Sequence, residues 1–300
     1  MDRSKPVVIL GPTASGKTRL AVALAEQLGG AILSADSRQV YKDLDIGTGK
    51  DLAEYGAIPY YLVDLVEAGS RFDISQYLHY AKRALEHVTE AGFRPIVCGG
   101  TGLYIQGLLK GIAYSEVPVN EGLRAQLEEQ NIAALRARLA ESTLPVDFKP
   151  DTSTAKRTIR AIEIANWVVQ NPDYSPVAAL LPDAHVFGLN PPLENRRKQI
   201  SVRLTKRLQE GLLEEVEGLL ARNIQPEQLI YYGLEYKYCT LYLLGEMDRE
   251  TFESRLETEI HRFAKRQMTF FRSMEKGGVR IHWLEGEDVE SQQAEVLAHL

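Results

Sequence analysis

Short apolar runs alternate with segments of helical periodicity over the first 113 residues of the chain. The apolar runs predict four strands: Val7–Leu10, Ala31–Ser34, Tyr60–Asp64 and Pro95–Cys98. The segment from Phe72 to Ala91 predicts a helix before the last of them. Strands and helices that alternate in this way form βαβ units with parallel strands. We therefore expect a parallel sheet with helices on both faces and ligands at the carboxyl ends of its strands.

The pattern changes near Tyr114. Between Glu121 and Glu141 four leucines recur at multiples of four, which predicts one amphipathic helix: Leu123, Leu127, Leu135 and Leu139. A second helix is expected over roughly Thr154–Val169, in a region with many prolines. This part of the chain has the pattern of a helical insertion.

Strand and helix patterns then alternate again. Val186–Leu189 has the pattern of another strand of the main sheet, and Ile281–Leu284 that of an edge strand. Helices are predicted from near Glu194 and over about Arg249–Met274. The end of the chain therefore returns to the α/β fold with which it began.

Length allows either one large α/β domain with an insertion or two domains, because 300 residues exceed what one small core needs. We expect an α/β fold in which a parallel sheet flanked by helices is formed by residues 1–113 and 186–300. Residues 114–185 would form a mainly helical insertion domain.

Composition narrows the class of protein. The chain is 44% hydrophobic and 25% charged, as in globular proteins, and no run of eighteen apolar residues predicts a membrane span. The N-terminus continues almost directly into the first strand, so no signal peptide is expected. Cys98 and Cys239 lie far apart without metal-ligand spacing, which favours reduced thiols and a cytoplasmic location. A net charge of −6 excludes a uniformly basic surface, but not a local basic stripe that binds nucleic acid.

The first strand continues into a phosphate-loop (P-loop) motif, GPTASGKT. Backbone N–H groups of such a loop, together with the N-terminus of the next helix, bind an anion. Lys17 can reach the outer phosphate, and the Thr18 hydroxyl can ligate Mg²⁺. A chance match is disfavoured by the strand before the motif and the helix pattern after it. The predicted phosphate-binding residues are Gly11, Pro12, Thr13, Ala14, Ser15, Gly16, Lys17 and Thr18.

Polar residues also follow the second and fourth strands. Asp36 could bind Mg²⁺ through water, accept a proton or cap a helix. Arg38 and Gln39 suit hydrogen bonds to a base edge or a phosphate, but equally suit a solvated surface. Thr101 lies between glycines after the fourth strand. Its hydroxyl could contact a ligand at the carboxyl end of the sheet, or it could cap a tight turn.

Three blocks, GPTASGKT, DSRQVYKDLDIGT and GGTGLYI, together resemble one family, the tRNA dimethylallyltransferases. These enzymes prenylate N6 of the adenine next to the anticodon. Downstream, Arg157–Glu163, Gly211–Val216 and Ala264–Arg272 resemble the family's R-x-x-R-A-L-E, G-L-L-E-E-V and A-K-R-Q-x-T-W-F-R segments. The resemblance covers roughly residues 7–275, nearly the whole chain.

The resemblance implies a reaction and roles for the residues. The P-loop and Mg²⁺ would stabilise the diphosphate that leaves dimethylallyl diphosphate. Asp36 would take the proton from the attacking amine, and Thr101 would hold that amine or a diphosphate oxygen. The adenine must leave its stack, and Ser37, Arg38 and Gln39 are candidates to hold it, together with Asp36 and Thr101.

The resemblance also implies where tRNA binds. The insertion would grip the anticodon stem, and Arg124 matches an arginine that touches tRNA. Two basic clusters coincide with family blocks and predict phosphate contacts: Lys156, Arg157 and Arg160 on one helix, and Arg262, Lys265, Arg266 and Arg272 on the last helix. A third, Arg196–Lys198, is assigned to a solvated surface. We expect a monomer that acts away from membranes.

The chain departs from the family pattern at three places. Tyr60-Tyr61 replaces His-His, Thr152–Thr154 replaces Pro-Asn-Asp, and Glu235 takes the glycine position of G-Y-K-E. None of these changes touches the P-loop, Asp36 or Thr101, so they bear on RNA positioning rather than on the type of reaction.

Three other functions are compatible with parts of the sequence. An enzyme that prenylates free AMP, ADP or ATP would share the P-loop and Asp36 but would not need the insertion. A small-molecule kinase would need an arginine-bearing lid, which we do not identify in the sequence. A non-catalytic RNA- or nucleotide-binding module would not need Lys17, Thr18, Asp36 and Thr101 together.

Overall fold

The computed structural model describes residues 5–145, 148–174 and 177–300. The chain forms two compact units. The first, the sheet unit, consists of Met1–Lys110 and Leu180–Leu300, and the second, the insertion unit, consists of Gly111–Ala179. These bounds lie close to the division at residues 114 and 185 that the sequence pattern indicates.

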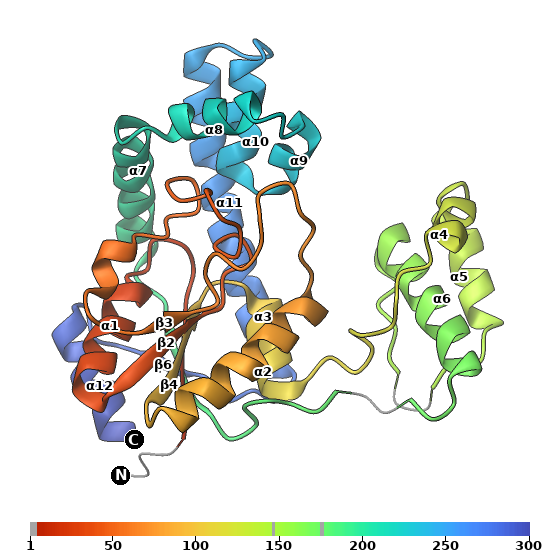
Figure 1. Cartoon of the computed structure of the whole chain (residues 1–300), viewed down its shortest axis with the longest axis horizontal. Coiled ribbons are helices and arrows are strands. Elements are labelled where there is room, and N and C mark those ends of the chain that lie inside the picture. Colours follow the sequence, from red (N-terminus) through yellow and green to blue (C-terminus); the bar gives the residue numbers. More distant parts are fainter. Residues whose placement is uncertain (1–4, 146–147, 175–176) are drawn as a thin grey trace. The chain divides into compact units, whose positions relative to one another are not determined.

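Parallel strands form a six-stranded sheet in the order β3-β2-β4-β1-β5-β6 (Figure 1). The predicted α/β fold with a parallel sheet is confirmed. All residues of the three central strands β2, β4 and β1 are buried, as in a sheet covered on both faces. The strands are β1 (Val7–Leu10), β2 (Gly30–Ser34), β3 (Tyr60–Tyr61), β4 (Arg94–Gly99), β5 (His185–Leu189) and β6 (His282–Leu284).

The third strand is shorter than predicted. β3 ends at Tyr61, because Leu62 and Asp64 have φ values of 67° and 55°, in the left-handed region that a strand does not adopt. The N–H of Asp64 instead donates to the carbonyl of Gln39 at 3.0 Å. The prediction of a strand up to Asp64 is therefore wrong beyond Tyr61.

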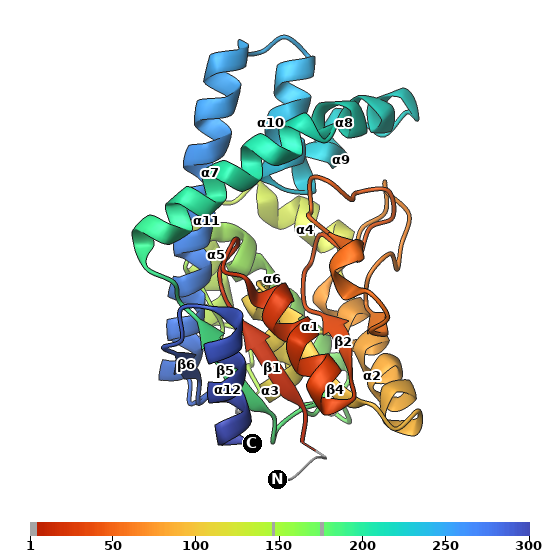
Figure 2. The same cartoon turned by 90° about the vertical axis from the view of Figure 1, so that its left-hand side faces the viewer.

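Helices cover both faces of the sheet. α1 (Lys17–Leu28) and α12 (Val289–His299) pack on one face, in front of the sheet in Figure 2. α2 (Ile74–Glu90) and α3 (Gly102–Lys110) pack on the other. α2 begins at Ile74 rather than at the predicted Phe72, because the Asp73 carboxylate accepts from the Gln76 N–H and forms a capping box.

Five further helices complete the sheet unit. α8, α9 and α10 lie beyond the end of the sheet that faces away from the N-terminus (Figure 1). No helix among the described residues combines the length and the apolar character needed to cross a membrane. The five helices are α7 (Leu193–Gln209), α8 (Leu212–Ala221), α9 (Pro226–Tyr231), α10 (Leu234–Leu243) and α11 (Arg249–Lys276), and a short 3₁₀ helix, η1, spans Leu52–Tyr55.

The insertion unit contains α4 (Glu121–Glu128), α5 (Ile132–Ala140) and α6 (Ala155–Gln170). The prediction of a single helix over 121–141 is therefore wrong. A second helix, α5, begins after Asn131, because the Asn131 side chain accepts a hydrogen bond from the Ala134 N–H and caps it. The burial predicted by the leucine pattern holds. Leu127, Leu135 and Leu139 form one cluster with residues of α6.

Candidate functional site

The loop between β1 and α1 has the backbone shape of an anion nest. Gly16, which precedes the first helical residue, has a φ of 84°, and Ala14 has a φ of 59°. Successive turns of this kind aim backbone N–H groups into one hollow at the helix N-terminus. The Ser15 hydroxyl oxygen is buried without a hydrogen-bond partner among the described residues, and an added Cβ on Gly11 would lie 2.7 Å from it. An unsatisfied buried hydroxyl in a nest of N–H groups fits a bound anion.

Lys17 begins α1 and belongs to the same loop. Its Nζ donates to the Pro12 carbonyl at 3.4 Å, and it forms no salt bridge within the described part of the chain. Burial lowers the pKa of Lys17 below its ordinary value of 10.5. The cations of Arg203 and Arg207 lower this pKa further, while the Asp36 carboxylate opposes them. The ammonium group therefore lacks a fixed counter-ion, and an anionic ligand would supply one.

Two arginines of α7 complete a group of three cations. Burial lowers the pKa of Arg203 to about 10, and the positive charge of Arg207 is the second cause of this shift. Arg203 and Arg207 line one small cavity with Thr13 of the P-loop. Arg207 is paired with Glu235 at 3.2 Å, whereas Arg203 has an ion pair with the more exposed Asp51 at 3.3 Å. The residues around the P-loop thus favour a ligand with more than one negative charge.

The turn after β2 carries Asp36. Its Oδ1 accepts from the Arg38 N–H at 2.9 Å, two residues on, which makes an Asx turn rather than a helix cap. The Ser37 N–H donates to Oγ1 of Thr101 at 3.0 Å, and the Thr101 N–H donates to the Ala35 carbonyl at 3.1 Å. Because β2 and β4 are neighbouring parallel strands, the two predicted catalytic residues, Asp36 and Thr101, follow adjacent carboxyl ends of the sheet. The negative charge of Asp36 raises the pKa values of Lys17 and Arg203, against the stronger effect of burial, which lowers both.

Gln39 is half-buried, and both ends of its side-chain amide are hydrogen-bonded within the protein. Its side-chain oxygen accepts from the Ser34 hydroxyl at 2.9 Å, and its Nε2 donates to the Gly49 carbonyl at 3.0 Å. The Arg38 guanidinium lies over the Tyr231 ring, 5.3 Å from its centroid. Arg38 thus stays close to the surface of α9, while Gln39 supports the following loop.

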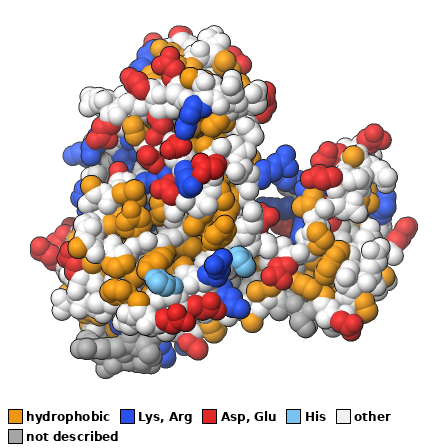
Figure 3. Space-filling view, viewed as in Figure 1, with side chains coloured by type: hydrophobic (Ala, Val, Ile, Leu, Met, Phe, Trp, Pro, Cys, Tyr) orange, Lys and Arg blue, Asp and Glu red, His pale blue; other side chains and the backbone are white. Residues whose placement is uncertain are grey.

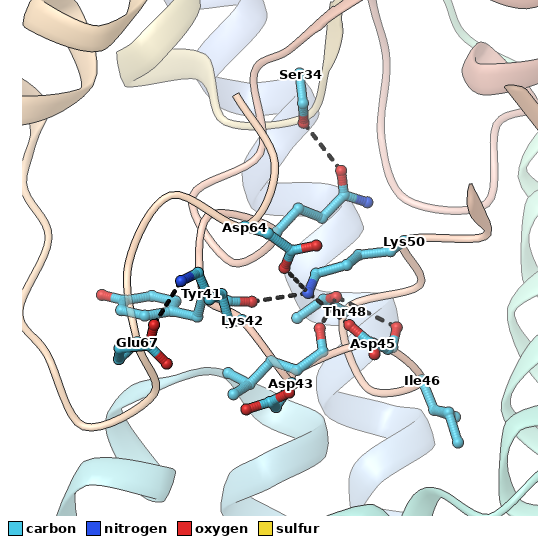
Figure 4. A network of polar contacts seen from close by, with 12 residues as sticks. Ser34, Tyr41, Lys42, Asp43, Asp45, Ile46, Thr48, Lys50, Asp64 and Glu67 are labelled. Atoms are coloured by element: carbon cyan, nitrogen blue, oxygen red, sulfur yellow. Dashed lines mark hydrogen bonds and ion pairs between the residues drawn. The ribbon is translucent and has the colours of Figure 1, made fainter. Parts of the chain in front are cut away.

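Residues 42–51 form that loop, which is fixed by a buried lysine (Figure 4). Lys50 is 2% exposed and donates to the Tyr41 carbonyl at 2.8 Å and to the carboxylates of Asp45 and Asp64. The Glu215 carboxylate accepts from the N–H groups of Asp45, Ile46 and Gly47 at 2.7–3.0 Å. Glu215 is the second glutamate of the G-L-L-E-E-V segment, and its role is to anchor residues 42–51, the same loop to which Gln39 donates a hydrogen bond.

Comparisons with known proteins agree with this site. The sequence matches the family model described as IPP transferase over residues 39–274, and the model described as isopentenyl transferase over residues 5–57. A "tRNA dimethylallyltransferase 1" of Porphyromonas gingivalis is 46% identical over 302 residues, which is 98% of each chain. The chain belongs to the tRNA dimethylallyltransferase family.

One further relative and two solved structures extend the comparison. A "tRNA dimethylallyltransferase 1" of Parabacteroides distasonis is 48% identical and covers 93% of this chain and 92% of its own. Among solved structures, the full-length tRNA isopentenylpyrophosphate transferase of Bacillus halodurans has a TM-score of 0.72 at 28% identity, over 99% of this chain and 95% of its own. A eukaryotic dimethylallyltransferase acting on tRNA has a TM-score of 0.78 over 99% of this chain and 79% of its own; at 22% identity this likeness concerns the fold alone.

The basic residues predicted from the family blocks differ in their exposure and in whether they have ion-pair partners. Lys265 and Arg266 are exposed on α11, and Arg266 approaches Glu259 to 4.0 Å. On the face in Figure 3, Lys and Arg side chains are interspersed with Asp and Glu side chains rather than gathered in one field. A net charge of −6 is compatible with local basic patches but not with a uniformly basic surface.

In the insertion unit two of the predicted arginines have internal partners. Arg124 is bidentate to the buried Glu163, with both N–O distances 2.9 Å. Arg160 donates to the Val117 carbonyl at 2.6 Å and to Glu163 at 3.4 Å. Lys156 and Arg157 are exposed, and Arg157 pairs with Asp151 at 2.8 Å.

Sequence reasoning missed the arginines of α7. Arg203 and Arg207 are four residues apart and so share a helix face, but a pair of arginines on a helix does not by itself indicate what the face approaches. The informative sequence signal is Glu235 in the place of the family's glycine, since this carboxylate is the partner of Arg207. The departure is visible in the sequence, but nothing in the sequence indicates that Glu235 pairs with Arg207.

Proposed function

We propose that the protein transfers a dimethylallyl group from dimethylallyl diphosphate to N6 of the adenine at position 37 of tRNA, next to the anticodon, giving N6-isopentenyladenosine. One observation carries the proposal. The Asp36 carboxylate and the Thr101 hydroxyl lie at the same sheet edge as a phosphate loop that has three cations around it. The names of the homologues support the same reaction.

In this reaction the bond between C1 of the dimethylallyl group and the diphosphate oxygen breaks, and a bond between C1 and N6 forms. Negative charge develops on the leaving diphosphate. The N–H groups of residues 14–18, the Lys17 ammonium and the Arg203 guanidinium would stabilise that charge from fixed positions. We therefore assign Gly11, Pro12, Thr13, Ala14, Ser15, Gly16, Lys17 and Thr18 to diphosphate binding.

N6 of adenine must lose a proton as the C–N bond forms. The Asp36 carboxylate would accept this proton. The Thr101 hydroxyl, already oriented by the Ser37 N–H, would hold the amine in line with C1. Ser37, Arg38 and Gln39 are candidates to hold the flipped adenine, with Gln39 acting through the loop that it supports.

Mg²⁺ fits the donors that are present. The Thr18 hydroxyl at the start of α1 and the Asp36 carboxylate in the turn after β2 are hard oxygen donors. Among the described residues, no group of three or more His, Cys, Asp or Glu side chains could hold a metal ion. Thr18 would hold the ion, whose charge would offset that of the leaving diphosphate.

For tRNA we propose that the insertion unit grips the anticodon stem and that the protein acts as a monomer. Lys156 and Arg157 are the insertion's exposed candidates for phosphate contacts, and Arg124 and Arg160 would contact RNA only with donors that Glu163 leaves unused. Lys265 and Arg266 of α11 are further candidates.

One assay separates this proposal from its rivals. The protein is incubated with labelled dimethylallyl diphosphate, Mg²⁺ and either total tRNA or free adenine nucleotides. We expect label in tRNA, at the adenine next to the anticodon. Label on AMP, ADP or ATP alone would support a free-adenylate prenyltransferase, and phosphate transfer from ATP would support a kinase.

A further inference from the structure

A buried glutamine bridges the two loops of the proposed site. Gln267 of α11 is 8% exposed. Its side-chain oxygen accepts from the Thr13 N–H of the P-loop at 2.8 Å, and its Nε2 donates to the Gly100 carbonyl at 2.9 Å. Both ends of the amide are therefore used, one on each loop.

The glycine-rich loop after β4 is shaped around α11. An added Cβ on Gly100 would lie 2.4 Å from Nε2 of Gln267, and one on Gly102 would lie 2.2 Å from Cδ1 of Phe270. Gln267 and Phe270 are one helical turn apart and contact the residues on either side of Thr101. The position of the Thr101 hydroxyl is thus set by the same helix that ties down the P-loop.

We propose that Gln267 is a positioning residue for the transfer reaction. It fixes the separation between the P-loop, which would hold the diphosphate, and the Thr101 loop, which would hold the amine. It therefore aligns C1 of the allyl group with N6, although it touches neither reacting atom. This inference rests on the proposed function.

The amide is suited to this task because it has one acceptor end and one donor end. In Gln267→Met both bonds are lost, and the Thr13 N–H becomes free to donate to the diphosphate. Binding of dimethylallyl diphosphate should then persist while alignment is lost. In Gln267→Glu the acceptor remains, but a negative charge is added beside the P-loop, so diphosphate binding should weaken.

The experiment compares Gln267→Met, Gln267→Glu and the wild type. Thr269→Ala is the matched control, since this exposed residue of α11 donates its side-chain hydrogen bond within its own helix, to the Lys265 carbonyl. Measured quantities are kcat, the KM for dimethylallyl diphosphate, the Kd of an unreactive analogue, the Tm, and the ratio of dimethylallyl alcohol to prenylated tRNA. The alcohol arises when water instead of N6 attacks C1, with release of the same diphosphate.

For Gln267→Met we expect kcat per folded molecule to fall about 10- to 100-fold with the analogue Kd unchanged within about threefold, and the share of alcohol to rise. For Gln267→Glu we expect the KM to rise. If kcat falls only in proportion to the folded fraction and the alcohol share equals that of Thr269→Ala, Gln267 is structural and the inference is wrong. A wild-type protein that prenylates no tRNA would instead contradict the proposed function.

Discussion

The Ser37 N–H donates a hydrogen bond to Oγ1 of Thr101 at 3.0 Å, which joins two residues that lie 64 positions apart in the sequence. The bond connects the turn after β2 with the turn after β4, and these strands are neighbours in the sheet. It fixes the backbone between Asp36 and Arg38, where the Asx turn also orients the Asp36 carboxylate. The proposed base is thus held from two sides before any substrate binds.

Asp36→Asn should abolish transfer while leaving tRNA binding nearly intact. The amide oxygen can still accept from the Arg38 N–H, so the turn is kept, but the side chain can no longer accept a proton. We expect the single-turnover rate to fall about 10²- to 10⁴-fold. Filter binding of tRNA to the variant provides the control. A variant with wild-type activity would remove Asp36 from the mechanism.

Binding of diphosphate should weaken as the pH rises toward the alkaline range. The pKa of Lys17 lies below 10.5 in the free protein, so its positive charge is lost earlier than that of an ordinary lysine as the pH rises. An anionic ligand favours the charged form, so binding should also take up protons at high pH.

Calorimetry with an unreactive diphosphate analogue, without tRNA, measures both effects between pH 7 and pH 9.5 in buffers of different ionisation enthalpy. Lys17→Arg is the matched variant, because a guanidinium keeps its charge over this range. We expect a flatter pH response for Lys17→Arg. Identical pH profiles for the two proteins would mean that Lys17 does not titrate on binding.

The sequence predicts the fold well because its signals are local. Buried strands such as Val7–Leu10 appear as short apolar runs, and the P-loop motif has glycines where the backbone needs them. The errors are also local in origin. Positive φ values at Leu62 and Asp64 end β3. The leucine pattern correctly predicts which residues are buried, but it does not show that the helix is interrupted at the Asn131 cap.

Much of the site could not be predicted, because its supports come from distant parts of the chain. Gln267 contacts Thr13 across 254 positions, and Glu215 contacts Asp45 across 170. Periodicity indicates that a helix has a buried face, but not which loop that face meets. Gln267 and Glu215 lie in segments that resemble family blocks, but their hydrogen-bond partners are seen only in the three-dimensional structure.

Arg124 should matter for stability as well as for any RNA contact. The Glu163 side chain is 1% exposed, and Arg124 supplies two of its hydrogen bonds. Arg124→Ala leaves this buried carboxylate with Arg160 and the Asn120 N–H, at a cost of about 1–3 kcal/mol in the free energy of unfolding.

Chemical denaturation of the whole chain measures this cost. Arg157→Ala is the control in the same unit, because its ion pair with Asp151 is exposed and its removal should change stability by at most about 0.5 kcal/mol. Equal stability of the two variants would argue that Arg124 is free for RNA rather than committed to Glu163.

Affinity for tRNA should fall steeply with salt if Lys265 and Arg266 contact phosphates. Each contact releases condensed counter-ions, so the logarithm of the binding constant falls linearly with the logarithm of the salt concentration. Lys265→Ala should lower the steepness of that slope by about 0.7–0.9, whereas Lys82→Ala, an exposed lysine of α2 outside every family block, should leave it unchanged. Titrations of tRNA at several salt concentrations measure both slopes. Parallel slopes for Lys265→Ala and the wild type would exclude a phosphate contact at this residue, and a flat response of the wild type would count against RNA as the substrate.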